Sequence, residues 1–251
     1  MKFSVDLNAD LGEGSGHDAE LFELITSANI ATGFHAGDPS SMLDSTCAAK
    51  EKGVAVGAHP SFADRKNFGR QEIAVPIPEL FAQLVYQLGA FQSVALAAGV
   101  RPNHVKPHGA LYNMAVRNEE MAKTIAQAIL AVDHSLILFA PANSAMEREA
   151  RKAGVEIAPE IFADRNYLND GWLVPRTRPD ALLRDPKQAA ERVLRMLREG
   201  KVRSVEGRDI DVRGETICVH GDTPGAVEFV RELRTQLESE GVKICAPKSS
   251  R

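Results

Sequence analysis

The segment FSVDLNADLGEG, residues 3–14, decides the fold. It begins with Phe3–Leu7, a short run of strand character, and then carries polar residues at two-residue spacing before a glycine-rich turn. Side chains of an extended backbone alternate between two faces, so Asp6, Asn8 and Asp10 point to the same face. A strand that ends in this way predicts a functional site at its carboxyl end.

The same order, a short apolar run and then a longer amphipathic one, repeats along the chain. Helix starts are indicated at Asp38-Pro39, Pro78, Pro141, Pro186 and Thr223-Pro224. The predicted strands are Phe3–Leu7, Ala28–Ala31, Val54–Ala58, His104–Lys106, Leu136–Ala140, Val155–Ala158 and Thr216–Val219, with weaker candidates at Val202–Val205 and Val242–Cys245. Such alternation predicts a mostly parallel sheet, which is either an open doubly wound sheet or a closed barrel.

Polar residues that follow the strands favour the barrel. Six of the seven predicted strands run into charged or imidazole side chains beside Gly or Pro; the fifth ends in Ala140-Pro141 without one. The polar residues concerned are Asp6, Asn8, Asp10, Glu13, His35, Asp38, His59, Lys106, His108, Glu160, Asp164, Arg165, His220 and Asp222. In a β/α barrel every strand contributes to one rim, whereas an open sheet draws on fewer strands.

Composition narrows the class of protein. The chain has 251 residues and a net charge of -4, which suits one domain over residues 1–251, since no Pro/Gly/Ser-rich linker divides it. Without a Lys/Arg run we expect no nucleic-acid partner and no membrane partner. No apolar run is expected to span a bilayer, and the amino terminus turns polar too early for a signal peptide. Three distant cysteines fit a reducing cytoplasm.

Each polar group also has a structural interpretation. Asp38 and Asp222 precede helices and suit N-caps. Asp6 in the first strand needs a partner, for which Lys106 is the natural counter-ion. The histidines that follow strands, with nearby carboxylates, suit either general acid–base chemistry or a divalent metal, although no HExxH-like spacing supports the metal. Asp10, His59 and His108 are the candidate metal ligands.

Other segments carry weaker signals. Residues 12–16 are glycine-rich but lack the pattern of a phosphate-binding loop, so we expect an active-site loop there. An anionic substrate would need one or two of the arginines in turn-rich segments, which are Arg65, Arg70, Arg165 and Arg176. Cys47 and Cys218 are interpreted as buried small residues rather than nucleophiles.

Six segments together resemble the LamB/YcsF family, whose members are also called the A subunit of 5-oxoprolinase. They are DLNADLGEG at 6–14, NIATGFHAGDP at 29–39, GAHPSFADRKNFGR at 57–70, VKPHGALYN at 105–113, EIFADRNY at 160–167 and CVHGDTP at 218–224. They occur in family order, from residue 6 to residue 224. Thr32 departs from the pattern, since many members carry a cysteine there, and this argues against a thiol mechanism at that position.

The resemblance implies both fold and function. It implies an irregular, TIM-like β/α barrel of about seven strands, similar to the glycoside hydrolase/deacetylase superfamily. It also implies one component of a multi-subunit enzyme that opens 5-oxo-L-proline to L-glutamate, coupled to hydrolysis of ATP with Mg²⁺. The 5-oxoprolinase subunits B and C are the expected partners. The alternatives are a stand-alone metal-dependent hydrolase or deacetylase acting on a carbohydrate or amide, and a non-catalytic component that binds substrate or scaffolds its partners.

The resemblance also suggests roles for the motif residues. Asp10 or Glu13 is the expected base for water, and His108 or His220 the acid for the leaving nitrogen. Lys106 and Arg165 would offset negative charge. Substrate or nucleotide binding is expected from the remaining motif residues, which are Asn8, His35, Asp38, Arg70, Glu160, Asp164, Arg165 and Asp222.

Overall fold

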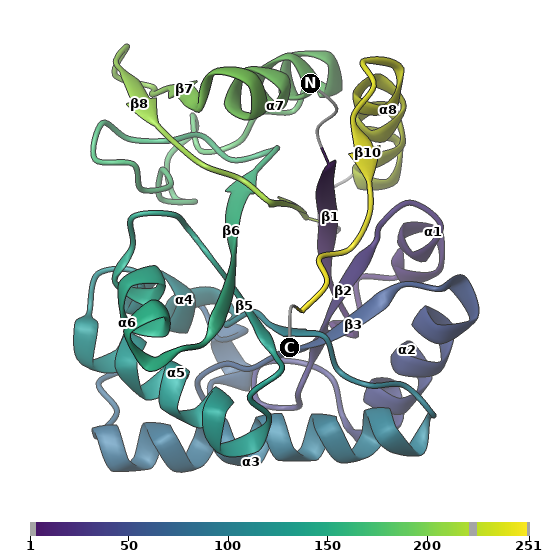
Figure 1. Cartoon of the computed structure of the whole chain (residues 1–251), viewed down its shortest axis with the longest axis vertical. Coiled ribbons are helices and arrows are strands. Elements are labelled where there is room, and N and C mark those ends of the chain that lie inside the picture. Colours follow the sequence, from purple (N-terminus) through teal and green to yellow (C-terminus); the bar gives the residue numbers. More distant parts are fainter. Residues whose placement is uncertain (1–3, 221–224, 250–251) are drawn as a thin grey trace.

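β1 (Ser4–Leu11) is the strand at which the sheet closes on itself in the computed structural model, which describes residues 4–220 and 225–249 (Figure 1). It pairs in parallel with β2 (Ser27–Ala31) on one side and with β9 (Thr216–Val219) on the other. The strands between them are β3 (Ala55–His59), β4 (His104–Val105), β5 (Ile137–Ala140) and β6 (Glu156–Phe162). The order β1-β2-β3-β4-β5-β6-β9 is therefore a closed parallel barrel of seven strands, as predicted.

Two strands are longer than the sequence predicted. β1 continues to Leu11 and β6 to Phe162, so that Asp10 and Glu160 lie within strands rather than after them. The prediction was wrong here because polar side chains inside this barrel bond to one another, and a polar residue therefore does not end a strand.

The two weaker strand candidates have different positions. β10 (Lys243–Ile244) pairs in parallel with the first residues of β1 and extends the sheet there. The segment predicted at 202–205 is β7 (Lys201–Arg203), which forms an antiparallel hairpin with β8 (Asp209–Asp211) beside α7. Its single buried residue is Val202. The hairpin packs against α7 and lies outside the barrel.

Helices cover the outside of the barrel. They are α1 (Asp18–Phe22), α2 (Pro39–Lys52), α3 (Ile77–Ala97), α4 (Gly109–Ala115), α5 (Glu119–Val132), α6 (Ala145–Ala153), α7 (Pro186–Glu199) and α8 (Ala226–Ser239). Their starts and stops follow local chemistry. Asp38 and Ser41 form a capping box on α2, and left-handed glycines such as Gly53 and Gly200 end α2 and α7. The predicted cap at 223–224 lies outside the described residues.

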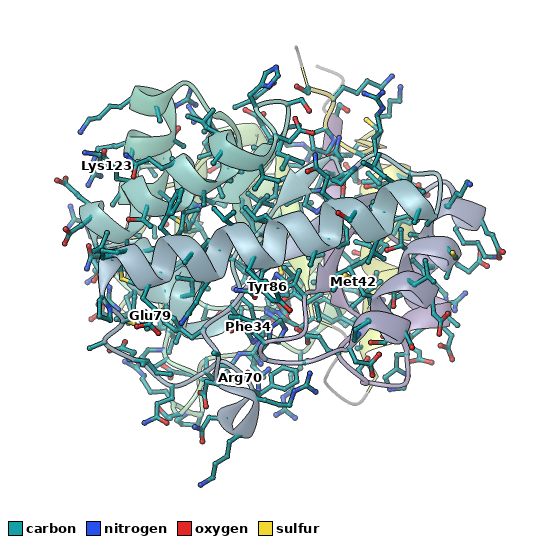
Figure 2. The ribbon with its side chains drawn as sticks, turned by 90° about the horizontal axis from the view of Figure 1, so that it is seen from below. Phe34, Met42, Arg70, Glu79, Tyr86 and Lys123 are labelled. Atoms are coloured by element: carbon teal, nitrogen blue, oxygen red, sulfur yellow. The ribbon has the colours of Figure 1, made fainter. Side chains whose placement is uncertain are left out.

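α3 is the longest helix of the described part, and Figure 2 shows it crossing one side of the molecule. Its 21 residues reach a mean hydropathy of 1.3, so by length and composition alone it could cross a membrane, contrary to the sequence expectation. Leu84, Leu88 and Phe91 are buried on its inner face. Because it packs against α2, α5 and β3, α3 is an outer helix of the barrel.

Candidate active site

The inward face of β1 carries Asp6, Asn8 and Asp10 one above another, as the two-residue spacing predicted. Asp6 is 1% exposed and accepts hydrogen bonds from the hydroxyls of Thr26 (2.6 Å), Ser27 (2.8 Å) and Thr216 (2.6 Å). Burial raises the pKa of Asp6 to about 6, although these hydroxyls act in the opposite direction. The expectation that Lys106 is its counter-ion was wrong, because Lys106 reaches the barrel interior higher up, at the level of Asp10.

Lys106 follows β4 and is the cation at the centre of the site. Its ammonium group lies 2.9 Å from Asp10 Oδ1, 3.2 Å from Glu160 Oε1 and 3.2 Å from Asn8 Oδ1. The sulfur of Cys218 is 3.0 Å away. Cys218 is buried, as expected, but it faces this polar network rather than apolar neighbours. Residues of β1, β6 and β9, together with Lys106 directly after β4, thus form one polar network in the barrel.

Opposite charges determine the protonation of this network. Burial alone would raise the pKa of Asp10, but the adjacent His59 and Lys106 outweigh it and hold that pKa well below its usual range. Burial would likewise lower the pKa of Lys106, yet Asp10, Cys218 and Glu160 raise it well above the ordinary value. At neutral pH the site therefore contains an ionised Asp10 beside a charged Lys106.

Three imidazoles and one carboxylate lie beside this network. We call Glu13, His35, His59 and His108 the histidine cluster. Glu13 Oε1 is 2.9 Å from His35 Nε2, 3.3 Å from His108 Nδ1 and 3.7 Å from His59 Nε2. The rings of His35 and His108 stack with centroids 3.9 Å apart. His59 is the last residue of β3, and His35 and His108 follow β2 and β4. Burial, reinforced by neighbouring imidazoles, lowers the pKa of His35 to about 2 and that of His108 well below its normal value.

The loop after β3 closes over the histidine cluster. Phe68 and Gly69 both have positive φ angles, 55° and 63°. This backbone turns the Phe68 carbonyl to His108 Nε2 at 2.9 Å and sets the Phe68 ring edge-on to His35 and His108. A Cβ atom at Gly69 would lie 2.9 Å from His35 Cβ, so only glycine fits against the cluster. Left-handed backbone at a phenylalanine is costly and is characteristic of functional sites.

Asp164 and His220 form a second pair at the same rim. His220 Nδ1 lies 2.8 Å from Asp164 Oδ2, so Nδ1–H donates a hydrogen bond to the carboxylate, and in the neutral ring Nε2 carries the lone pair. Burial would raise the pKa of Asp164, but His220 outweighs it and keeps that pKa below the usual value. One ring nitrogen of His220 is within 4.8 Å of a carboxylate oxygen of Asp10 and of the Cys218 sulfur. The pair has the arrangement of an oriented general acid or base.

A cavity of about 500 Å³ opens over these groups. The candidate residues that line it are Asp10, Glu13, His59, Arg70, Lys106, His108, Glu160, Arg165 and His220. Arg117 and Arg176 add further positive charge to its wall, and Trp172 and Leu173 supply apolar surface. Burial and the nearby Arg176 lower the pKa of Arg165 to about 10, so its guanidinium remains charged at neutral pH.

The remaining predicted site residues within the described part of the chain do not line the cavity. Asn8 lies beneath the cavity in the hydrogen-bond network, and His35 lies behind His108 in the histidine cluster. Asp164 does not line the cavity but orients His220, which does. Asp38 is exposed, caps α2 through Ser41 and does not line the cavity, which agrees with its structural interpretation. Asp222 lies outside the described residues.

Two residues of the site were missed from the sequence. Asn29 Nδ2 donates to both Asn8 Oδ1 and Asp10 Oδ1 at 2.8 Å, and its own Oδ1 lies 2.8 Å from His104 Nε2. The hydroxyl of Tyr112 donates to Glu160 at 2.6 Å. A polar residue within the apolar strand SANIA was a signal for Asn29. The position of Tyr112, four residues after His108 in a helix, was a signal for the other.

A closed β/α barrel with acidic, basic and imidazole groups at the carboxyl ends of its strands belongs to the TIM-like class, in which that end of the barrel carries the active site. The family comparison makes this specific. A sequence model of the LamB/YcsF family matches residues 5–251, and the chain belongs to that family.

Solved structures agree with this assignment. A lactam utilization protein from Thermus thermophilus is 46% identical, with a TM-score of 0.91, and the match covers 98% of this chain and 100% of that one. A putative cellobiose-phosphate cleavage protein from Enterococcus faecalis V583 is 13% identical, with a TM-score of 0.56 over 98% and 97% of the two chains. A T48 deacetylase is also 13% identical, with a TM-score of 0.51 over 97% and 87%. The latter two share the fold.

Proposed function

We propose that this chain is the A component of a cytoplasmic, ATP-dependent 5-oxoprolinase that opens 5-oxo-L-proline to L-glutamate together with subunits B and C. Family membership and the 46% identical lactam utilization protein support an action on a cyclic amide. The observation that carries the proposal is the charged Lys106 in the cavity wall, hydrogen-bonded to Asp10 beside Glu160. Such an ammonium group suits an amide oxygen that receives a negatively charged phosphoryl group during the reaction.

The cavity also suits an anionic substrate with a second reactant. 5-Oxoproline carries one carboxylate, for which Arg70, Arg165 and Arg176 in the wall are the candidate partners. About 500 Å³ is more space than a five-membered lactam needs, and it falls within the range of ligand pockets. The remainder would accommodate the phosphate end of ATP with its Mg²⁺, delivered with the help of the partner subunits.

The chemistry explains why ATP is required. A five-membered lactam is a stable amide, so its opening needs activation. Transfer of the γ-phosphoryl group to the amide oxygen releases ADP and makes the ring carbon electrophilic. Water adds to that carbon, the carbon–nitrogen bond breaks as the nitrogen takes a proton, and a second water hydrolyses the resulting acyl phosphate to glutamate and phosphate.

Residues at the rim have distinct roles in this scheme. Lys106 offsets the negative charge of the phosphoryl group carried by the amide oxygen, and Asp10 holds Lys106 in position and in its charged form. His220, oriented by Asp164, takes a proton from water and returns it to the ring nitrogen. The low pKa of Asp10 makes it a weaker base than the sequence suggested, so we assign proton transfer to His220 instead.

Reconstitution tests the proposal. The purified chain is mixed with subunits B and C, 5-oxo-L-proline, Mg²⁺ and ATP, and glutamate and ADP are measured. We expect equal amounts of the two products, and none when ATP or any one of the proteins is omitted. Absence of glutamate from the complete mixture, with all three proteins folded and associated, would contradict the proposal.

The histidine cluster favours one alternative, a stand-alone metal-dependent hydrolase or deacetylase. Glu13, His35, His59 and His108 offer four donor atoms within 4.8 Å of one another. Amide or ester hydrolysis by the isolated chain without ATP, lost after treatment with a chelator, would favour this alternative over the ATP-dependent reaction.

A further inference from the structure

The histidine cluster brings four electron-pair donors from four separate segments of the chain to one point. Three strand ends contribute His35, His59 and His108, and the turn after β1 contributes Glu13. His59 Nε2 and His108 Nδ1 are 2.9 Å apart, and Glu13 Oε1 is within 3.7 Å of all three imidazoles. All three histidines are at most 5% exposed.

The positions of the ring hydrogens follow from the outer contacts. His59 Nδ1 lies 2.6 Å from the Lys106 carbonyl, and His108 Nε2 lies 2.9 Å from the Phe68 carbonyl. A carbonyl oxygen only accepts, so both of these nitrogens carry hydrogen. In a neutral imidazole the opposite nitrogen then carries a lone pair. With both rings neutral, His59 Nε2 and His108 Nδ1 would turn two lone pairs toward each other at 2.9 Å, beside the Glu13 carboxylate and with Asp10 Oδ2 3.3 Å from His59 Nε2. Asp10 and Glu13 outweigh burial and raise the pKa of His59, so the positive charge they favour at this point is carried either by a proton on Nε2 or by a bound ion.

Such an arrangement requires a positive charge at its centre. We propose that Glu13 Oε1, His35 Nε2, His59 Nε2 and His108 Nδ1 bind a divalent transition-metal ion, with Zn²⁺ the best match. Three imidazoles and one carboxylate suit Zn²⁺ or a similar first-row ion, whereas Mg²⁺ and Ca²⁺ prefer oxygen ligands. This set replaces Asp10 in the sequence-based prediction by Glu13 and His35.

Four of the six ligand-atom separations lie near the tetrahedral value, and all six are within 4.8 Å. The stacked rings of His35 and His108 would have to tilt apart for both nitrogens to point at one ion. An ion held about 2.0–2.1 Å from its ligands separates neighbouring ligand atoms by about 3.4 Å. The four separations given above for this cluster lie between 2.9 and 3.7 Å. The backbone carbonyls of Lys106 and Phe68 also have the role that metal-binding histidines commonly require, which is to accept the second ring N–H and fix the tautomer.

A neighbouring set of groups is a poorer candidate. Asp10, Cys218 and His220 also place donor atoms within 4.8 Å of one another. The ammonium group of Lys106 already lies 2.9 Å from Asp10 and 3.0 Å from Cys218, and it supplies the positive charge there. A second cation at this position would be repelled.

The proposed site opens to the reaction cavity, since Glu13, His59 and His108 line the wall. A bound ion would supply Lewis acidity to that cavity. Metal binding does not depend on the proposed reaction, and it can be measured without turnover.

The test is metal binding by the whole chain. Protein stripped with a chelator is titrated with Zn²⁺ by calorimetry, and metal content is measured by elemental analysis after dialysis. We expect about one ion per chain and a rise in the melting temperature on binding. Co²⁺ in its place should give the visible absorption of a tetrahedral site.

Variants locate the ion. His35→Ala, His59→Ala and the milder Glu13→Gln should each weaken Zn²⁺ binding by about 100-fold or more, because each removes or weakens a ligand. Two control variants should bind Zn²⁺ as tightly as the unaltered chain. Cys218→Ser alters the neighbouring set, and His134→Ala removes an exposed histidine elsewhere.

Two results would overturn the proposal. Folded wild-type chain that takes up no stoichiometric Zn²⁺ or Co²⁺ would mean that a proton joins the two imidazoles. Loss of binding in Cys218→Ser, with binding retained in His35→Ala, would move the ion to the other set. Metal uptake without 5-oxoprolinase activity would refute only the proposed reaction, and activity without metal uptake would refute only the metal site.

Discussion

Asp6 and Asp10 lie on the same face of the same strand, four residues apart, in opposite environments. Asp6 is surrounded by three neutral hydroxyls in the lower barrel, and burial raises its pKa to about 6. Asp10 lies near the rim beside Lys106 and His59, which hold its pKa well below the usual value despite burial. The neighbouring charge, rather than depth or residue type, decides how readily each carboxylate ionises.

The largest effect on stability is expected from removing Lys106, the cation beside Asp10 near the rim. Lys106→Met leaves Asp10 and Glu160 without their shared partner in the barrel, which should cost about 3–5 kcal/mol in the free energy of unfolding. Urea denaturation measures this. Lys123→Met, on the exposed face of α5, is the matched control and should change stability little. A loss in Lys106→Met no larger than in this control would show that the two carboxylates do not depend on Lys106.

A smaller effect on stability, which depends on pH, is expected from Asp6 in the lower barrel. Because the folded-state pKa of Asp6 is raised from 3.8 to about 6, the unfolded chain ionises first as pH rises. Its carboxyl therefore costs nothing below pH 4, destabilises the fold progressively between pH 4 and 6, and keeps its full cost above pH 6. Asp6→Asn cannot ionise, so its stability relative to wild type should rise by roughly 3 kcal/mol from pH 4 to 7. Urea unfolding at several pH values tests this, and a difference independent of pH would contradict it.

The smallest effect is expected at Asp38. Variants of this residue distinguish a helix cap from a residue that binds substrate. Asp38→Ala removes the hydrogen bond to Ser41 N and should lower the melting temperature slightly, with no change in glutamate release by the reconstituted complex. Asp38→Asn retains the acceptor and should behave as wild type. Substrate affinity that falls in both variants would return Asp38 to the binding residues.

Much of this molecule could be predicted from its sequence, because strand and helix periodicity and polar strand ends are local properties. The alternation of Asp6, Asn8 and Asp10 placed them on one face, and the strand ends placed His59, Lys106 and His108 at one rim. Which of these groups touch each other depends on register, such as Asn8 opposite Cys218 between β1 and β9.

Register and strand tilt depend on residues that are distant in the sequence. Several side-chain contacts therefore could not be predicted. The level at which Lys106 enters the barrel decided between Asp6 and Asp10, and the sequence suggested the wrong partner. The proposed metal ligands differ from the predicted ones for the same reason: Glu13 comes from a turn whose path is set by glycines with positive φ at 12 and 14. The segment at 201–203 has the composition of a strand, and only tertiary packing shows that it pairs outside the barrel with β8.

The comparison of the two aspartates can be tested in a single assay. Glutamate release is measured for the complete complex containing wild-type chain, Asp10→Asn or Asp6→Asn, with each variant first shown to be folded. If the rim is the reactive region, Asp10→Asn lowers turnover by about 100-fold or more, because Lys106 loses the charge that positions it, while Asp6→Asn stays within a few-fold of wild type. Wild-type turnover by Asp10→Asn, or a greater loss in Asp6→Asn, would contradict this account.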